Sequence, residues 1–284
     1  MTRIQLKDNL GSERTDRWFS PNIWGDCPLE AIKNGTVIGR TFQDDFTGIV
    51  PNASAGAGAT AGLSTGGYLL YGDTGVTVKA QAGVEEGVLE VAGNDADNDE
   101  SVVSTGSPSF IVSDTAADAK KLWFEARVKK ASVADNACAM FVGLAWDHGD
   151  GVSVAKTVCL TDDDGALGAF SFLGFHVDQA NGDAMDFVYK AENQSAVVKI
   201  AGVEVPVADT FSKVGFVYDP DAPSTQRIKV FVNNVEQTTY VTSTNIATAT
   251  FPDAEPMAMA WAVKVGAAAE SKAQMDWWRA AQLG

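Results

Sequence analysis

Residues 122–129 read LWFEARVK, and their alternation of apolar and polar side chains is the clearest structural signal in the chain. The apolar residues at 122, 124, 126 and 128 are interleaved with Trp123, Glu125, Arg127 and Lys129. Successive side chains of a β-strand point to opposite faces of its sheet, so this pattern predicts a strand with one buried face and one outer face. Trp123 is expected on the outer face, beside the charged residues.

Short apolar runs separated by turn residues continue along the chain from residue 68. They lie at 68–71, 76–80, 87–91, 110–112, 122–129, 137–146, 156–160, 170–177, 186–189, 196–200, 213–218, 228–232, 238–241, 257–265 and 275–280. Helical patterns are confined to 116–121 and 267–273, where only short helices fit. Many short strands at close spacing are typical of an antiparallel β-sandwich, which often forms one large domain. We therefore expect an all-β fold with a single sandwich core.

The N-terminal residues 1–43 lack the period of a helix or a strand and are broken by several prolines and glycines. They carry large apolar side chains that such a segment cannot bury on itself. We predict an extended arm over 1–43 and the sandwich over 44–284, with a Gly/Ala/Ser/Thr-rich loop at 51–68. The arm is expected to lie on its own sandwich or on a partner. The candidate partner-binding residues are Trp18, Phe19, Ile23, Trp24, Leu29 and Ile32.

The charge of the chain is strongly acidic, with 21 Lys and Arg residues against 37 Asp and Glu residues, a net charge of −16. Residues 1–43 hold six of these basic and five of these acidic residues, so the remaining chain has a net charge of −17. An acidic surface repels phosphate backbones and anionic lipids, which argues against nucleic-acid binding and membrane docking. The charge is expected mainly to keep the protein soluble, with a basic partner or cations as the alternative.

The cysteines Cys27, Cys138 and Cys159 are few, odd in number and free of CxxC spacing. This pattern predicts neither a disulfide framework nor a zinc site, and it favours synthesis in a reducing cytoplasm. The N-terminus shows no apolar core of a signal peptide, and no apolar run is long enough to span a membrane. We expect no secretory signal and no membrane span.

Seven sequence motifs together resemble the concanavalin A-like lectin/glucanase superfamily over residues 44–284. They are DDF at 44–46 before the Gly-rich loop, LWFEAR at 122–127, FVGLA at 141–145, GFHVD at 174–178, KVGFVYD at 213–219, IKVFVNN at 228–234 and MDWWRA at 275–280. The resemblance implies an antiparallel jelly-roll sandwich. It implies no single activity, because the superfamily includes lectins, hydrolases, lyases and inert structural modules.

The whole chain, in which IWGDCPLEAIKNG at 23–35 precedes an acidic sandwich, resembles head-decoration proteins of tailed bacteriophages. This resemblance implies a virion structural protein, made in the host cytoplasm, that cements the outer capsid surface. Its arm would bind the major capsid protein, and neighbouring copies of the chain would be further partners. The alternative is a carbohydrate-binding, lectin-like module of a head fibre or tail that contacts the host surface.

Catalytic patterns are not found in the sequence. Glycoside hydrolysis needs two carboxyl groups that flank the bond to be cleaved, and the E-x-D-x-x-E strand pattern of sandwich glucanases is absent. Glu125 and Asp186 are single carboxylates on their predicted strands. A lyase base at His148 or His176 would need a basic cluster for its acidic substrate, and none shares a strand with either residue. We expect a protein that is not an enzyme, with His148 in a turn and His176 on a half-buried strand edge.

Three acidic runs, at 95–100, 147–150 and 162–165, have the oxygen-rich composition of calcium loops. None has the full EF-hand pattern, so solvated turns are expected and no cofactor is predicted. The alternative calcium ligands are Asp95, Asp97, Asp99, Asp162 and Asp164. Sugar rings stack on exposed indoles, for which the candidates are Trp123, Trp146, Trp261, Trp277 and Trp278. Core packing is expected for most of these, with Trp277 and Trp278 on opposite faces.

Overall fold

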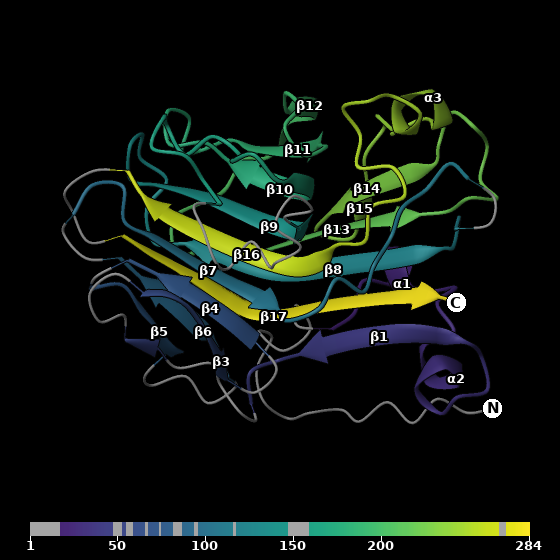
Figure 1. The fold of residues 1–284 in the computed structure, drawn as a ribbon, viewed down its shortest axis with the longest axis horizontal. Helices are drawn as coiled ribbons and strands as arrows, with labels where there is room; N and C mark the ends of the chain where they lie inside the picture. The colour runs from purple at the N-terminus through teal and green to yellow at the C-terminus, as the bar shows by residue number, and fades with distance from the viewer. Residues whose placement is uncertain are drawn as a thin grey trace.

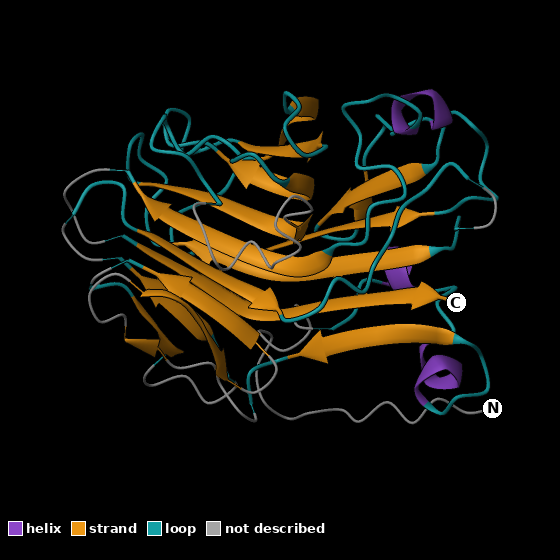
Figure 2. Ribbon diagram, in the orientation of Figure 1, coloured by secondary structure: helices purple, strands orange, loops and turns teal. Residues whose placement is uncertain are grey.

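The protein is a sandwich of two antiparallel β-sheets, seen in a computed structural model (Figure 1). The structure describes residues 18–47, 53–54, 59–65, 68–73, 75–81, 87–93, 96–115, 118–146, 159–266 and 271–284. Within these ranges the helices are short: α1 (Pro21–Trp24), α2 (Leu29–Lys33) and α3 (Ser243–Ile246), drawn in purple in Figure 2. The predicted all-β fold is confirmed.

Sheet A contains the alternating strand at its centre. In spatial order its strands are β15 (Val235–Glu236), β14 (Ile228–Val232), β13 (Ser212–Tyr218), β8 (Leu122–Lys130), β17 (Lys272–Leu283), β6 (Leu89–Ala92), β5 (Thr77–Ala80) and β2 (Ala53–Ser54). A further strand, β1 (Gly39–Asp44), pairs with the C-terminal half of β17 and lies along it in Figure 1. The first and the last strand of the described chain are therefore neighbours in one sheet.

Sheet B packs against sheet A. Its strands, in spatial order, are β12 (Val197–Glu204), β11 (Met185–Lys190), β10 (Ser171–Val177), β9 (Cys138–Trp146), β16 (Ala258–Val265), β7 (Glu100–Thr105), β4 (Tyr68–Gly72) and β3 (Ala59–Thr65). The last of these strands falls inside the Gly-rich region at 51–68, for which a loop was expected. That part of the prediction was wrong.

The main core fills the space between the two sheets. Phe124 of β8 stacks on Phe216 of β13 with ring centroids 5.1 Å apart, and Phe187 of β11 reaches Phe216 from the opposite sheet at 5.8 Å. Fully burying one such side chain contributes about 1.5–3 kcal/mol to folding. The inner face of the alternating strand is therefore fixed by aromatic packing across the sandwich.

The outer face of sheet A carries Trp123, as predicted, and it is covered by the chain's own N-terminal segment. Trp123 forms a second, smaller apolar cluster with Val217, Phe231 and Ala281 of the sheet and with residues of α1 and α2. Trp278 belongs to the main core, whereas Trp277 lies against Arg279. A register irregularity between Met275 and Trp277 accompanies this arrangement of β17. The two adjacent tryptophans therefore face opposite ways, as expected.

The N-terminal segment is not the extended arm that was expected, because it contains two short helices, and it lies on the chain's own sandwich. Residues 18–34, which we call the strap, contain α1 and α2 and lie on sheet A, while the predicted arm's last five residues, 39–43, all belong to β1. Ile23, Trp24 and Ile32 are buried in this way on the protein's own sandwich. An apolar cluster of the sheet beneath them packs against these side chains, which agrees with the first of the two alternatives for the arm, and partner binding through them stays a prediction. Residues 1–17 lie outside the described ranges.

Smaller expectations also had other outcomes. The runs at 110–112 and 238–241 form only isolated bridges, at Phe110 and Val241, and the described residues 118–121 are not helical. The run expected as a helix at 267–273 ends inside strand β17. His176 is buried within sheet B, because β10 lies between β9 and β11 rather than at an edge. Asp95, His148 and the acidic run at 147–150 lie outside the described residues. None of the described helices is long and apolar enough to cross a membrane.

Candidate binding groove beneath the strap

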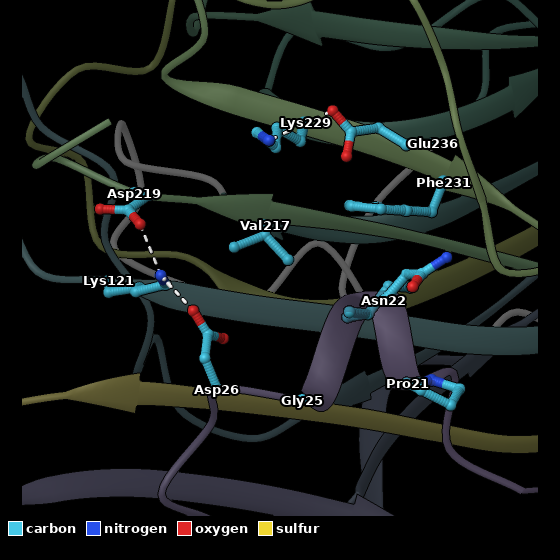
Figure 3. Close-up of a pocket in the computed structure, with 11 residues that line it drawn as sticks. Pro21, Asn22, Gly25, Asp26, Lys121, Val217, Asp219, Lys229, Phe231 and Glu236 are labelled. Atoms are coloured by element: carbon cyan, nitrogen blue, oxygen red, sulfur yellow. Dashed lines mark hydrogen bonds and ion pairs between the residues drawn. The ribbon is translucent and has the colours of Figure 1, made fainter. Parts of the chain in front are cut away.

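A groove of about 370 Å³ lies between α1 and the outer face of sheet A (Figure 3). Its volume falls within the range of roughly 300–1,000 Å³ that is usual for small-molecule sites. The strap supplies one wall and the sheet supplies the other. The lining residues are Pro21, Asn22, Ile23, Gly25 and Asp26 of the strap segment, and Lys121, Val217, Asp219, Lys229, Phe231 and Glu236 of the sandwich.

The short helix α1 is placed by its sequence and by a gap in the sheet. Pro21 occupies the first turn, where its missing N–H costs nothing and its fixed φ suits a helix. Ile23, one turn in, packs over Gly215 of β13, where an added Cβ would lie 2.6 Å from Ile23 Cδ1. Glycine at this position leaves the room that the isoleucine needs. The helix therefore packs closely on the sheet because Ile23 fits into the space above Gly215.

Two indoles make reciprocal hydrogen bonds across the interface between strap and sheet. Trp24 Nε1 of the strap donates to Glu125 Oε2 of β8 at 2.7 Å, and Trp123 Nε1 of β8 donates to Asp26 Oδ1 at 2.9 Å. The two residues therefore fix the strap in one register on the strand. Burial raises the pKa of the Glu125 carboxyl group, although the donors from Ser20 and Trp24 oppose this effect.

A hairpin turn holds the other end of α1. Asn233 and Asn234 adopt positive φ angles of 48° and 67° between β14 and β15, which is the conformation of a tight hairpin turn. Asn234 Oδ1 accepts a hydrogen bond from Asn22 N at 3.0 Å, and Asn234 O accepts one from Asn22 Nδ2 at 2.7 Å. This hairpin turn therefore also anchors the strap.

The rim of the groove is charged. Lys121 Nζ bridges Asp26 Oδ2 at 2.6 Å and Asp219 Oδ2 at 2.5 Å, and Lys229 Nζ lies 3.2 Å from Glu236 Oε1 (Figure 3). Burial opposes the charge on Lys121, but the hydrogen bonds that it donates to Asp219 and Asp26 outweigh this effect and raise the pKa of the ammonium group. Burial likewise opposes ionisation of Asp219, yet Lys121 holds its pKa below the usual value. The rim therefore presents three carboxylates and two ammonium groups.

This arrangement favours binding over acid catalysis. Ile23, Val217 and Phe231 close the bottom of the groove but are only 2–7% exposed, so most of the accessible lining is the ion pairs, which stand around it as hydrogen-bond donors and acceptors. A glycosidase acid needs a carboxyl group whose pKa is raised, so that it carries a proton at neutral pH. Asp219 is shifted in the opposite direction. The groove suits a ligand with several hydroxyl groups.

The described calcium candidates gather at one end of β16. The turn at 97–99 is joined to Val265 by a hydrogen bond from Asn98 N at 3.0 Å, and Asp162 pairs with the neighbouring Lys264 Nζ at 2.7 Å. Asp164 lies in the same turn as Asp162, where its backbone oxygen accepts from Gln179 N at 2.9 Å. Within the described ranges no group of three or more His, Cys, Asp or Glu residues is arranged to hold a metal ion.

A buried carboxyl group near this cluster was missed by the sequence reasoning. Glu100 of β7 is almost fully buried, and its oxygens accept hydrogen bonds from Leu160 N at 2.7 Å and Cys159 N at 3.0 Å. Burial raises the pKa of Glu100 to about 8. His176 is also buried, and burial lowers its pKa while its Nε2 contacts Gly165 O at 2.9 Å. Both side chains hold the backbone of residues 159–165 against sheet B.

The aromatic candidates divide between buried and exposed positions. All five tryptophans considered for sugar stacking are buried, so none presents an open ring face. In the strap, Phe19 is half-buried and stacks on the Arg279 guanidinium group, whose carbon lies 3.5 Å from the ring centre. Leu29 packs beside the outer cluster, and Trp18 remains 60% exposed.

The charged residues of the groove were not predicted from the sequence. Asp26, Lys121 and Asp219 are far apart in sequence, and no local pattern marked them as one site.

No protein-family model and no curated protein matches the chain. Among solved structures it is similar to a protein of unknown function from Shewanella oneidensis MR-1, with a TM-score of 0.52 and 13% identity over 90% of this chain and 94% of that one. Peanut lectin gives a TM-score of 0.50 and 13% identity, covering 86% and 97% of the two chains. The endo-β-1,4-glucuronan lyase of the fungus Trichoderma reesei gives 0.50 and 9%, covering 84% and 94%. The fold is the concanavalin A-like jelly-roll sandwich.

Proposed function

We propose that this protein is a carbohydrate-binding, lectin-like module and that the groove beneath the strap binds a neutral pyranose. The observation that carries the proposal is a hollow of about 370 Å³ whose rim alternates carboxylate and ammonium groups. A pyranose has an apolar face of C–H groups and an edge of hydroxyl groups. Each hydroxyl group can donate to a carboxylate and accept from an ammonium group, so the rim can bind it in either role.

The fold supports the same class of function. One structure that shares the sandwich with this chain is a lectin, and another is an enzyme named for the polysaccharide glucuronan. Their sequence identities of 13% and 9% extend the likeness to the fold and no further. The position of the proposed site therefore rests on the groove itself.

The charge of the groove favours a neutral ligand over an anionic one. Its rim holds Asp26, Asp219 and Glu236 against Lys121 and Lys229, one negative charge in excess. The chain as a whole has a net charge of −16. A polyuronate would meet repulsion both on approach and in the groove. Neutral hexoses avoid this cost.

The proposal is tested on a glycan array that holds neutral and uronate saccharides, followed by calorimetric titration of the saccharide that binds. Glu236→Ala and Lys229→Ala each remove a charged partner from the sheet wall without touching the strap. Losing a hydrogen bond to a charged group costs about 1.5–3 kcal/mol, so we expect the affinity of either variant to fall about 10-fold to 100-fold. Asp209→Ala is the matched control, because Asp209 lies 3.8 Å from Lys129 and does not line the groove.

Two outcomes would contradict the proposal. The first is an array on which no neutral saccharide binds. The second is a saccharide whose affinity falls equally in Glu236→Ala and in the Asp209→Ala control, because the binding site would then lie elsewhere.

A second proposal is the capsid role, in which the protein decorates a bacteriophage head by contacting the major capsid protein. The observation that favours it is the exposure of Trp18, the first residue of the strap, at 60% and of Ile38, which follows the strap, at 83%. These side chains are available to a partner, unlike Ile23 and Trp24. We expect the double variant Trp18→Ser, Ile38→Ser to lose its fixed copy ratio to the shell protein in purified particles. An unchanged ratio, or no association of the natural chain with particles, would end this reading.

A further inference from the structure

The groove has one wall that is not part of the sandwich. Asn22, Ile23 and Asp26 reach it from the strap segment, whereas Lys229 and Glu236 reach it from β14 and β15. Removing the strap from the sheet would leave an open, flat surface with no opposing groups. A ligand that touches both walls can therefore bind only while the strap is docked.

The strap cannot hold its own shape. Its helices have four and five residues, far fewer than the dozen or more that an isolated helix needs to be stable in water. Gly35 follows α2 with a φ of +75° and has no atom within 4 Å of the place where a Cβ would be. The segment that leads from the strap to β1 thus begins at a glycine whose side-chain position is open, and its amides bond back to α2. The strap is therefore an element whose order depends on its contacts with sheet A.

Glu125 is the polar centre of those contacts. Its side chain is fully buried, and its Oε2 accepts from Trp24 Nε1 at 2.7 Å and from Ser20 N at 3.3 Å. Its Oε1 has no hydrogen-bond partner among the described residues. Both donors belong to the strap, so undocking would remove them and return the carboxylate to water. The two states of Glu125 are thus a desolvated carboxylate under the strap and a hydrated one without it.

We propose that the strap is a movable wall of the binding groove, and that Glu125 is the positioning residue whose hydrogen bond with Trp24 controls whether the groove is assembled. The inference rests on the proposed carbohydrate site for its ligand. Because the ligand needs the docked state, ligand binding and strap docking must stabilise each other to the same extent.

The test is hydrogen exchange of the full chain, measured by mass spectrometry or NMR. The amides of Ile23, Trp24 and Gly25 donate to backbone oxygens within the strap, so their exchange reports docking. Helix α3 is a matched control of similar length, with the amides of Ile246 and Ala247 bonded in the same way and no residue in the groove. Glu125→Leu removes the acceptor, whereas Glu125→Gln keeps an oxygen that accepts from Trp24 Nε1.

We expect Glu125→Leu to exchange the strap amides about tenfold faster or more, with α3 unchanged, and to lose saccharide affinity by a similar factor. Glu125→Gln should restore both properties towards those of the natural chain. A mixture of methyl glucoside, methyl galactoside and methyl mannoside should slow exchange in the strap and leave α3 unaffected. If Glu125→Leu fails to fold, Trp24→Phe removes the donor and keeps most of the ring.

The outcomes separate the two proposals. Unchanged strap exchange in Glu125→Leu and Trp24→Phe would overturn the inference, whether or not a saccharide binds. Faster strap exchange with full saccharide affinity would also overturn it, because the groove would then not need the strap. If no neutral saccharide binds, the proposed function fails, and the movable wall is judged by exchange in the two variants alone.

Discussion

Trp24 and Trp123 exchange hydrogen bonds between the strap and sheet A, and each indole finds its acceptor on the other partner. Buried indole N–H groups usually find a partner, so the two bonds account for why tryptophan rather than phenylalanine occupies both positions. Interfaces between separate proteins use aromatic anchors in the same manner. Here the contact is made within a single chain.

Trp24→Phe should therefore destabilise the protein. The substitution keeps an aromatic ring but leaves Glu125 without its shortest hydrogen bond, which costs about 1–3 kcal/mol of unfolding free energy. Urea unfolding followed by far-UV circular dichroism measures the change. Trp18→Phe is the control and should be neutral, because Trp18 is mostly exposed. Equal stability of the two variants would show that the bond to Glu125 contributes nothing.

Glu100 should make stability depend on pH. Burial raises its pKa to about 8 in the folded protein from the ordinary 4.5, so between these values the folded state keeps a proton that the unfolded chain has lost. Its contribution to stability is therefore full below 4.5 and is lost as the pH rises through about 8. Burial lowers the pKa of His176, which affects stability at more acidic pH. This effect is the same in the natural chain and in a Glu100 variant, so a comparison of the two cancels it.

The comparison uses urea unfolding of the natural chain and of Glu100→Gln at about pH 5, 7 and 9. The natural chain should lose stability relative to the variant as the pH rises. A constant difference between the two proteins across this range would mean that Glu100 does not keep its proton on folding.

Strand β8 shows what a local pattern can predict, and the strap shows what it cannot. The alternation at 122–129 placed the strand within one residue of its observed end at Lys130, because a period of two directly states which face is buried. Similar local patterns predicted the runs that form β9, β13 and β14. They also predicted that Trp277 and Trp278 face opposite ways.

The groove could not be predicted in this way. Its polar contacts join Asp26 to Lys121 and Asn22 to Asn234, pairs that are 95 and 212 residues apart and carry no shared period. The strap buries its tryptophan on the outer face of a strand, a surface that the alternating pattern assigns to water. Only the folded sandwich brings these residues together.

Deletion of residues 1–34 should leave the sandwich folded and expose its outer apolar cluster. Trp123, Val217, Phe231 and Ala281 would then form an open patch on sheet A. We expect unchanged far-UV circular dichroism, together with dimers or larger species in light scattering. Deletion of residues 1–17 is the control and should stay in the association state of the natural chain, because it keeps the strap. A monomeric, stable product of the longer deletion would show that the strap covers nothing of consequence.

The molecule as a whole combines a shared sandwich with a strap that turns one of its outer faces into a groove. The sandwich accounts for the likeness to peanut lectin and the glucuronan lyase, which concerns the fold. The acidic surface, with a net charge of −16, favours solubility and neutral ligands. On these features we base the proposal that the groove between strap and sheet binds a neutral saccharide.

An NMR titration that follows the seven tryptophan indoles tests this claim most directly. Trp123 Nε1 bonds to Asp26, which lines the groove, and Trp24 Nε1 bonds to Glu125 beneath the strap, whereas Trp146 and Trp261 belong to sheet B. We expect a neutral saccharide to shift the indole resonances of Trp24 and Trp123 and to leave those of Trp146 and Trp261 in place. Shifts confined to sheet B, or none with any neutral saccharide, would contradict it.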